Sequence, residues 1–181
     1  HERAPSWAGP LAIADFGRAE VEEVTSACFV EAMAGELEAV GFRTEPGFDG
    51  LGATGTLWGG NLAMVCSLLG TPHLPRVKGG ILFLEDVNEH PYRVERCLLQ
   101  LLQAGVIDAQ KAVVLGAFTA YQPSPLDRGY SLKTAVQALR ARTGTPVLTG
   151  LPFGHVPTHV TLPVGRRVQL LVDGRNVLIG W

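Results

Sequence analysis

Ile81-Leu82-Phe83-Leu84 is an uninterrupted apolar run, the pattern of a strand that is buried on both faces of a sheet. Two more such runs follow it, Ala112-Val113-Val114-Leu115 and Pro146-Val147-Leu148. The segments between them, from Pro91 to Gly105 and from Ser131 to Arg142, have the apolar stripes of helices. This alternation of strands and helices predicts a parallel sheet with right-handed crossovers.

The flanks of this unit add smaller elements. Thr56-Leu57-Trp58 is a short strand candidate, and residues 61–69 form a short apolar helix pattern that Gly70 closes. At the other end, residues 167–172 and 177–181 alternate around an Asp-Gly turn, which is a hairpin signal. The sequence therefore predicts an α/β fold: a small parallel sheet with flanking helices and a C-terminal antiparallel hairpin.

The N-terminal part has a different pattern of apolar and turn-forming residues. Residues 20–38 predict a helix with acidic residues in its first turn and an inward stripe of Val21, Val24, Cys28 and Phe29. Residues 44–60 are rich in Gly and turn formers, which favours a loop or linker. We therefore place a domain boundary here, between residues 1–45 and an α/β domain of residues 46–181.

The composition is that of a globular, core-forming chain. Of the 181 residues, 46% are apolar and 18% are charged, and the net charge is −2 with Lys and Arg scattered except at Arg166-Arg167. Nothing in this charge pattern indicates a nucleic-acid surface or a polybasic membrane anchor. No apolar run approaches the ~18 residues that span a bilayer. The chain begins without a signal-peptide pattern. It also lacks an initiator Met, so we expect that its first residue is not the natural start.

The three cysteines are Cys28, Cys66 and Cys97, which are odd in number, far apart and without a C-x-x-C pair. This argues against a disulfide framework or a zinc knuckle and favours three reduced thiols in an intracellular protein. Cys66 and Cys97 lie in apolar helical patterns, which predicts that they fill the core.

Two short motifs match functional patterns by letter only. Gly50-Leu51-Gly52-Ala53-Thr54-Gly55 fits G-x-G-x-x-G, but no strand precedes it, no helix opens inside it, and no acid follows about 20 residues later. We predict a flexible linker there, with a nucleotide-binding module as the minor alternative. His155 and His159 are spaced like a helical metal pair, but Pro157 lies between them and no Glu follows His155, so no metal site is predicted.

Glu85 and His155 form the informative pair. Each follows a predicted parallel strand, so both fall at the carboxyl edge of the sheet, where open α/β sheets place their sites. A carboxylate bound to a histidine is two-thirds of a catalytic triad, and it predicts a separation of ~2.6–3.2 Å between a Glu85 oxygen and a His155 ring nitrogen. The simpler alternative is a helix-capping carboxylate and a solvent-exposed histidine. Asp86 and Glu89 are rival acids, better suited to capping or surface roles.

No nucleophile completes the triad within the sequence. The serines stand outside any G-x-S-x-G or similar strand–turn–helix elbow, and they are Ser6, Ser26, Ser67, Ser124 and Ser131. The residues alone therefore leave two possibilities open, a half-built hydrolase site or no site.

Five strings, in order, resemble the L,D-carboxypeptidase family, whose relatives include the microcin-immunity peptidases. They are Trp7-Ala8-Gly9-Pro10, Gly59-Gly60-Asn61-Leu62 with Leu69-Gly70-Thr71-Pro72, Leu82-Phe83-Leu84-Glu85-Asp86-Val87, Pro91-Tyr92-Arg93-Val94-Glu95-Arg96 and Pro152-Phe153-Gly154-His155. The resemblance implies a cytoplasmic serine peptidase that cleaves the L,D bond before the terminal D-Ala of muramoyl tetrapeptides. It implies Glu85 and His155 as the acid and the histidine, and no metal or organic cofactor.

The resemblance also implies a second, N-terminal domain that holds the serine in a G-x-S-D elbow, and it suggests a homodimer. Residues 1–45 would be the remnant of that domain plus the start of the linker, and this chain alone would be inactive. The alternative is a non-catalytic α/β domain that binds a peptide or acts in assembly. An upstream reading frame that contains the elbow would distinguish the two.

Overall fold

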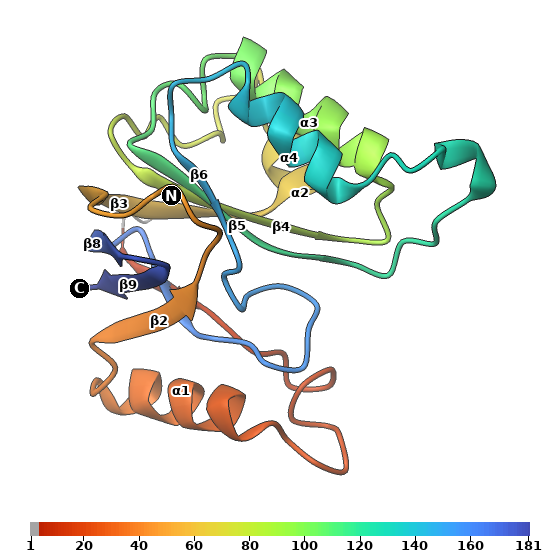
Figure 1. Ribbon diagram of the computed structural model, residues 1–181. Helices are drawn as coiled ribbons and strands as arrows, with labels where there is room; N and C mark the ends of the chain where they lie inside the picture. Colours follow the sequence, from red (N-terminus) through yellow and green to blue (C-terminus); the bar gives the residue numbers. More distant parts are fainter. Residues whose placement is uncertain (1–3) are drawn as a thin grey trace.

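The computed structural model describes residues 4–181. Its main feature is one mixed seven-stranded sheet, shown in Figure 1. In spatial order its strands are β2 (Ala39–Arg43), β9 (Asn176–Gly180), β8 (Arg167–Asp173), β3 (Gly52–Asn61), β4 (Ile81–Val87), β5 (Ala112–Thr119) and β6 (Val147–Thr149). The four strands from β3 to β6 are parallel to one another, and β8, β9 and β2 continue the sheet in antiparallel fashion. The predicted α/β fold is confirmed, and the hairpin extends the parallel sheet.

Strand β4 lies inside the sheet and is buried on both faces, as its sequence predicts. Ile81 and Phe83 belong to one hydrophobic core, while Leu82 and Leu84 belong to the core on the opposite face. All four side chains are fully buried. A strand with apolar residues at every position is stable only where both faces are covered, which fixes β4 in the interior.

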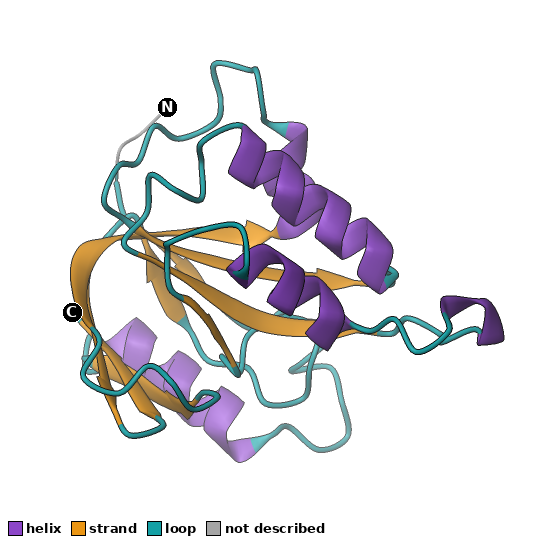
Figure 2. Ribbon diagram, turned by 45° about the horizontal axis from the view of Figure 1, so that its top comes forward, coloured by secondary structure: helices purple, strands orange, loops and turns teal. Residues whose placement is uncertain are grey.

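The helices cover the two faces unequally. Helices α2 (Leu62–Ser67), α3 (Pro91–Gln103) and α4 (Leu132–Arg140) lie together over one face, and α1 (Glu23–Ala34) lies on the other side of the sheet (Figures 1 and 2). A short 3₁₀ turn, Pro125–Asp127, precedes α4. A separate two-stranded ribbon joins β1 (Ser6–Ala8) to β7 (Leu162–Val164).

The strand candidate Thr56-Leu57-Trp58 is confirmed, but the strand is longer, Gly52–Asn61, so the prediction of a linker over residues 44–60 is wrong from residue 52 onward. Its first half, Gly52–Thr56, pairs with β8, and its second half, Leu57–Asn61, pairs with β4. Gly55 serves close packing, since a Cβ there would lie 2.3 Å from the carbonyl oxygen of Gly79. Of the three glycines that suggested a flexible segment or a phosphate-binding loop, Gly55 thus allows two backbones to approach each other, whereas a Cβ at Gly50 would meet nothing within 4 Å.

The N-terminal helix is shorter than predicted, and its inward stripe is different. Its buried residues are Thr25, Cys28 and Ala32, whereas Val21 and Val24 are 37% and 50% exposed. Strand β2 pairs with β9 and so belongs to the main sheet. Whether residues 1–45 derive from another domain stays a prediction, and the first three of them lie outside the described residues.

Two of the three thiols are less buried than predicted. Cys28 is buried, but Cys66 and Cys97 are only half-buried beside the core under α3. The Cys66 thiol donates to the Cys97 carbonyl oxygen at 3.4 Å. Burial, and then the neighbouring Cys97, raise the pKa of Cys66 to about 12, so this thiol stays protonated and unreactive.

Candidate active site

Glu85 occupies an irregular point of β4. The pairing of β4 with β5 shifts register between Leu84 and Asp86, where the single residue Glu85 of β4 faces two residues of β5, Gly116 and Ala117. The extra residue therefore lies on β5, and the regular ladder between the two strands is interrupted beside Glu85. The Glu85 side chain is only 6% exposed, so its carboxylate is held inside the protein at the carboxyl end of the sheet.

His155 is held by a loop that follows β6 and runs beside the end of β5. The Ala117 N–H donates to the Phe153 carbonyl at 2.8 Å, and the Thr119 hydroxyl donates to the His155 carbonyl at 3.2 Å. The Phe153 ring packs edge-on against Phe83 in the core, with centroids 5.0 Å apart. These contacts fix the backbone on both sides of the imidazole.

Two glycines make room for this loop. Gly154 has φ +123°, and a Cβ there would lie 3.0 Å from both Cβ and Oε2 of Glu85. Gly116 on β5 faces the loop, and a Cβ there would come within 2.5 Å of the Phe153 carbonyl oxygen. Larger residues at either position would push the loop away from Glu85, so the site requires glycine at both.

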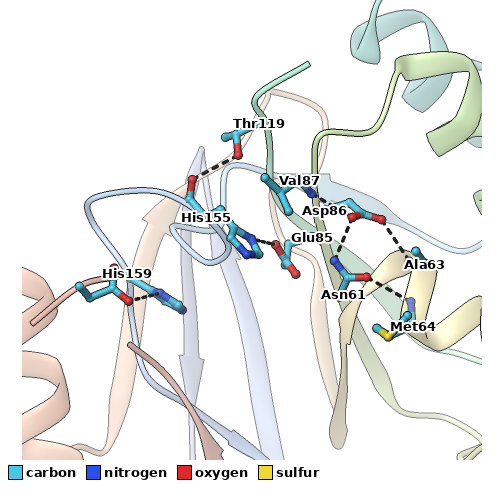
Figure 3. Close-up of polar contacts among 10 residues, drawn as sticks. Asn61, Ala63, Met64, Glu85, Asp86, Val87, Thr119, His155 and His159 are labelled. Atoms are coloured by element: carbon cyan, nitrogen blue, oxygen red, sulfur yellow. Dashed lines mark hydrogen bonds and ion pairs between the residues drawn. The ribbon is translucent and has the colours of Figure 1, made fainter. Parts of the chain in front are cut away.

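The two predicted site residues meet. His155 Nδ1 lies 3.0 Å from Glu85 Oε2, within the predicted range (Figure 3). The His155 side chain is 49% exposed while the carboxylate is buried, so the acid lies inside and the imidazole faces outward. A carboxylate in this position fixes the ring orientation and stabilises an imidazolium, which is the arrangement that a general base requires.

The rival acids have other partners. Figure 3 shows that Asp86 points away from His155, toward the start of α2. Its carboxylate accepts from Asn61 Nδ2 at 2.9 Å and from the Ala63 N–H at 3.1 Å. Glu89 forms an ion pair with Arg93 one turn later. Both acids therefore have structural roles, as their positions in the sequence favour.

A pocket of about 230 Å³ opens beside the pair. Asp15 and Arg18 line it from the N-terminal segment, and Gly154 and His159 line it from the loop. No serine or cysteine of residues 4–181 lines it. Sequence reasoning missed Asp15 and Arg18, because no local motif marks them and they reach the pocket only through tertiary packing.

His159 is buried beside the pocket. Its Nδ1 lies 3.8 Å from Asp15 Oδ2, its ring packs edge-on against Phe153, and its Nε2 is buried without a partner among the described residues. Burial lowers the pKa of His159 below its ordinary 6.5; the Asp15 carboxylate opposes this shift and His155 adds to it. His155 and His159 face different carboxylates, and residues 4–181 contain no cluster of three or more potential metal ligands.

The free energy of unfolding should fall as the pH drops below 6.5, in part because of His159. The unfolded chain takes up a proton on this histidine near pH 6.5, whereas the folded chain takes it up only at lower pH. The loss is at most about 1.4 kcal/mol per pH unit for one proton. Urea unfolding at pH 7.5 and 5.5 should show a smaller pH dependence for His159→Gln than for the unmodified chain. An unchanged slope in His159→Gln would contradict the assignment.

Over residues 4–181, none of the helices has the length and apolar character needed to cross a membrane.

Comparison with known proteins identifies the family of this chain. Residues 54–170 match the family model described as the LD-carboxypeptidase C-terminal domain. The "Probable murein peptide carboxypeptidase" of Bacillus subtilis is 30% identical over 177 residues, which cover 94% of this chain and 54% of that protein. The murein tetrapeptide carboxypeptidase of Pseudomonas aeruginosa is 37% identical over 121 residues, 64% of this chain and 38% of that protein.

A solved structure agrees. The crystal structure of muramoyltetrapeptide carboxypeptidase from Oxalobacter formigenes superposes with a TM-score of 0.90 at 42% identity, over 97% of this chain and 60% of that one. The chain thus spans little more than half the length of these two relatives that it matches almost throughout. The matched residues 54–170 include both Glu85 and His155. The chain belongs to the LD-carboxypeptidase family, of which it carries the C-terminal domain.

Proposed function

We propose that this chain supplies the histidine and the acid of a serine carboxypeptidase. The enzyme would cleave the L,D bond before the terminal D-Ala of muramoyl tetrapeptides in cell-wall recycling. The observation that carries the proposal is the 3.0 Å contact between His155 Nδ1 and Glu85 Oε2 at the edge of a pocket. The names of the relatives from Pseudomonas aeruginosa and Oxalobacter formigenes support the substrate class.

In the proposed mechanism His155 acts through its second ring nitrogen, Nε2. This nitrogen takes the proton from a serine hydroxyl as the serine oxygen attacks the carbonyl carbon before D-Ala. It then gives the proton to the leaving amine as the C–N bond breaks, and water hydrolyses the acyl-enzyme by the same route. Glu85 orients the imidazole throughout. No metal or organic cofactor is required by these steps.

The serine is proposed to come from a G-x-S-D elbow outside these 181 residues, because none of the serines of residues 4–181 lines the pocket. The oxyanion donors would be backbone N–H groups near that serine. Exposed apolar side chains support a covering partner at the N-terminal segment: Leu11, Ile13, Val24, Val30 and Met33 are each at least half exposed. We propose that this partner is the serine domain, that the enzyme is a homodimer, and that it works in the cytoplasm.

Stereospecific release tests the proposed activity. The chain is combined with the segment encoded upstream of it in the native reading frame, which should contain the elbow; we call this the complemented enzyme. It should release D-Ala and a tripeptide from a tetrapeptide that ends in D-Ala, and it should leave the matched peptide ending in L-Ala intact. Chromatography of the released amino acid measures both reactions. The proposed activity is wrong if neither peptide is cleaved, and the L,D assignment is wrong if both are cleaved equally.

A further inference from the structure

A carboxypeptidase must distinguish the last residue of a peptide from an internal one, and the distinguishing group is the terminal carboxylate. A guanidinium is well suited to bind a carboxylate, because its planar N–H groups can donate two parallel hydrogen bonds. Among the described residues that line the pocket beside Glu85 and His155, Arg18 is the one lysine or arginine. Arg18 is therefore the residue of this pocket whose charge and hydrogen-bond donors suit the terminal carboxylate of a peptide.

The Arg18 side chain is tied to its own segment and retains free donors. Its Nε donates to the Ala14 carbonyl oxygen at 2.5 Å, one turn earlier in the chain. A guanidinium has five N–H donors, so the four on the two terminal nitrogens remain for a ligand. Within residues 4–181 no carboxylate forms an ion pair with Arg18.

The two acids of the pocket are already engaged. Glu85 pairs with His155, and Asp15 is buried, accepts from the Leu11 N–H at 2.6 Å and faces His159. Arg18 therefore leaves one end of the pocket positive.

On its other side Arg18 borders a second hollow with Glu20 and Glu22. The Glu22 carboxylate caps α1 by accepting from the Val24 N–H at 3.0 Å. Of these two acids, Glu22 thus already serves the helix.

We propose that Arg18 binds the terminal carboxylate of the substrate and so makes the enzyme a carboxypeptidase. This inference rests on the proposed function. The amide attacked by the serine and the terminal carboxylate belong to the same alanine residue, separated by a single Cα. A ligand cleaved next to His155 therefore places its carboxylate inside the same pocket, which Arg18 also lines.

The test compares two substrates of the complemented enzyme, a tetrapeptide ending in D-Ala and the same peptide with a C-terminal amide. The unmodified enzyme should prefer the acid. Arg18→Gln should lower kcat/KM for the acid by about 10- to 100-fold, the range for a lost hydrogen bond to a charged group, with most of the change in KM. Cleavage of the amide should be unchanged, and Arg18→Lys should give an intermediate preference because lysine keeps the charge without the planar donors.

Arg142→Gln is the matched control. Arg142 is an exposed arginine outside the pocket that also bonds a carbonyl four residues earlier, that of Ala138, so its loss removes the same charge and a similar contact. It should leave the acid-to-amide ratio unchanged. If Arg18→Gln keeps the acid-to-amide ratio of kcat/KM of the unmodified enzyme, or lowers kcat/KM equally for both substrates, the inference is wrong while the proposed function stands. If the unmodified enzyme cleaves neither substrate, the proposed function fails and the inference fails with it.

Discussion

The 181-residue chain by itself is expected to release no D-Ala from a tetrapeptide that ends in D-Ala. Histidine and acid alone cannot form an acyl-enzyme, and among the described residues no serine or cysteine lines the pocket. Serine proteases without their serine retain a rate of roughly 10³–10⁴ over water, which comes from the oxyanion hole and substrate binding. We expect this chain to lack the oxyanion hole as well, so its rate should fall to the background of the buffer.

Adding the upstream segment with its elbow, joined or as a separate chain, should restore release. The control is the same segment with its elbow serine changed to Ala, which should restore nothing. Robust release by the 181 residues alone would mean that the nucleophile is one of their own residues. In that case, labelling with a fluorophosphonate and mapping of the modified peptide would identify it, and the proposed division of the triad would be wrong.

In the complemented enzyme, His155→Ala should lower kcat by about 10³-fold or more, since the serine loses both its base and the acid for the leaving amine. Glu85→Gln should also lower kcat, because a neutral amide can hold the ring but cannot stabilise the imidazolium. The loss should appear in kcat, because the imidazolium charge forms only during the reaction. Steady-state rates of D-Ala release measure both variants.

Asp86→Asn is the matched control for Glu85→Gln. It changes the neighbouring buried carboxylate, which points the other way and binds Asn61 and the start of α2. Its effect on kcat should be much smaller. Equal losses of kcat in the two variants would indicate that both acids act through the stability of this region. That result would count against a special role for Glu85.

The buried strands and the Glu85–His155 contact could be predicted because their signals are local. Ile81 to Leu84 is apolar at every position, which only a strand covered on both faces explains. The direction of parallel strands then places residues that follow them at one edge of the sheet. Glu85 and His155 are 70 residues apart in the sequence, and the structure joins their side chains at 3.0 Å.

The first half of strand β3 and two residues of the pocket escaped prediction because they lack such local signals. Strand β3 begins with Gly52 and Gly55, whose composition indicates a loop, and only the backbone of Gly79 beside Gly55 explains the glycine there. Arg18 and Asp15 lie in a segment without regular structure, and they reach the pocket because that segment packs against the His155 loop. Such contacts depend on the whole tertiary fold, so no window of sequence contains them.

A double-mutant cycle on Glu85 and His155 tests whether these two side chains act as one unit, with the acid working only through the histidine. Rates of D-Ala release are measured for the complemented enzyme with Glu85→Gln, with His155→Ala and with both changes. We expect the double variant to be no slower than His155→Ala alone, because the effects of changing residues of one catalytic unit are not additive. Losses in kcat that multiply, or full activity after His155→Ala, would contradict it.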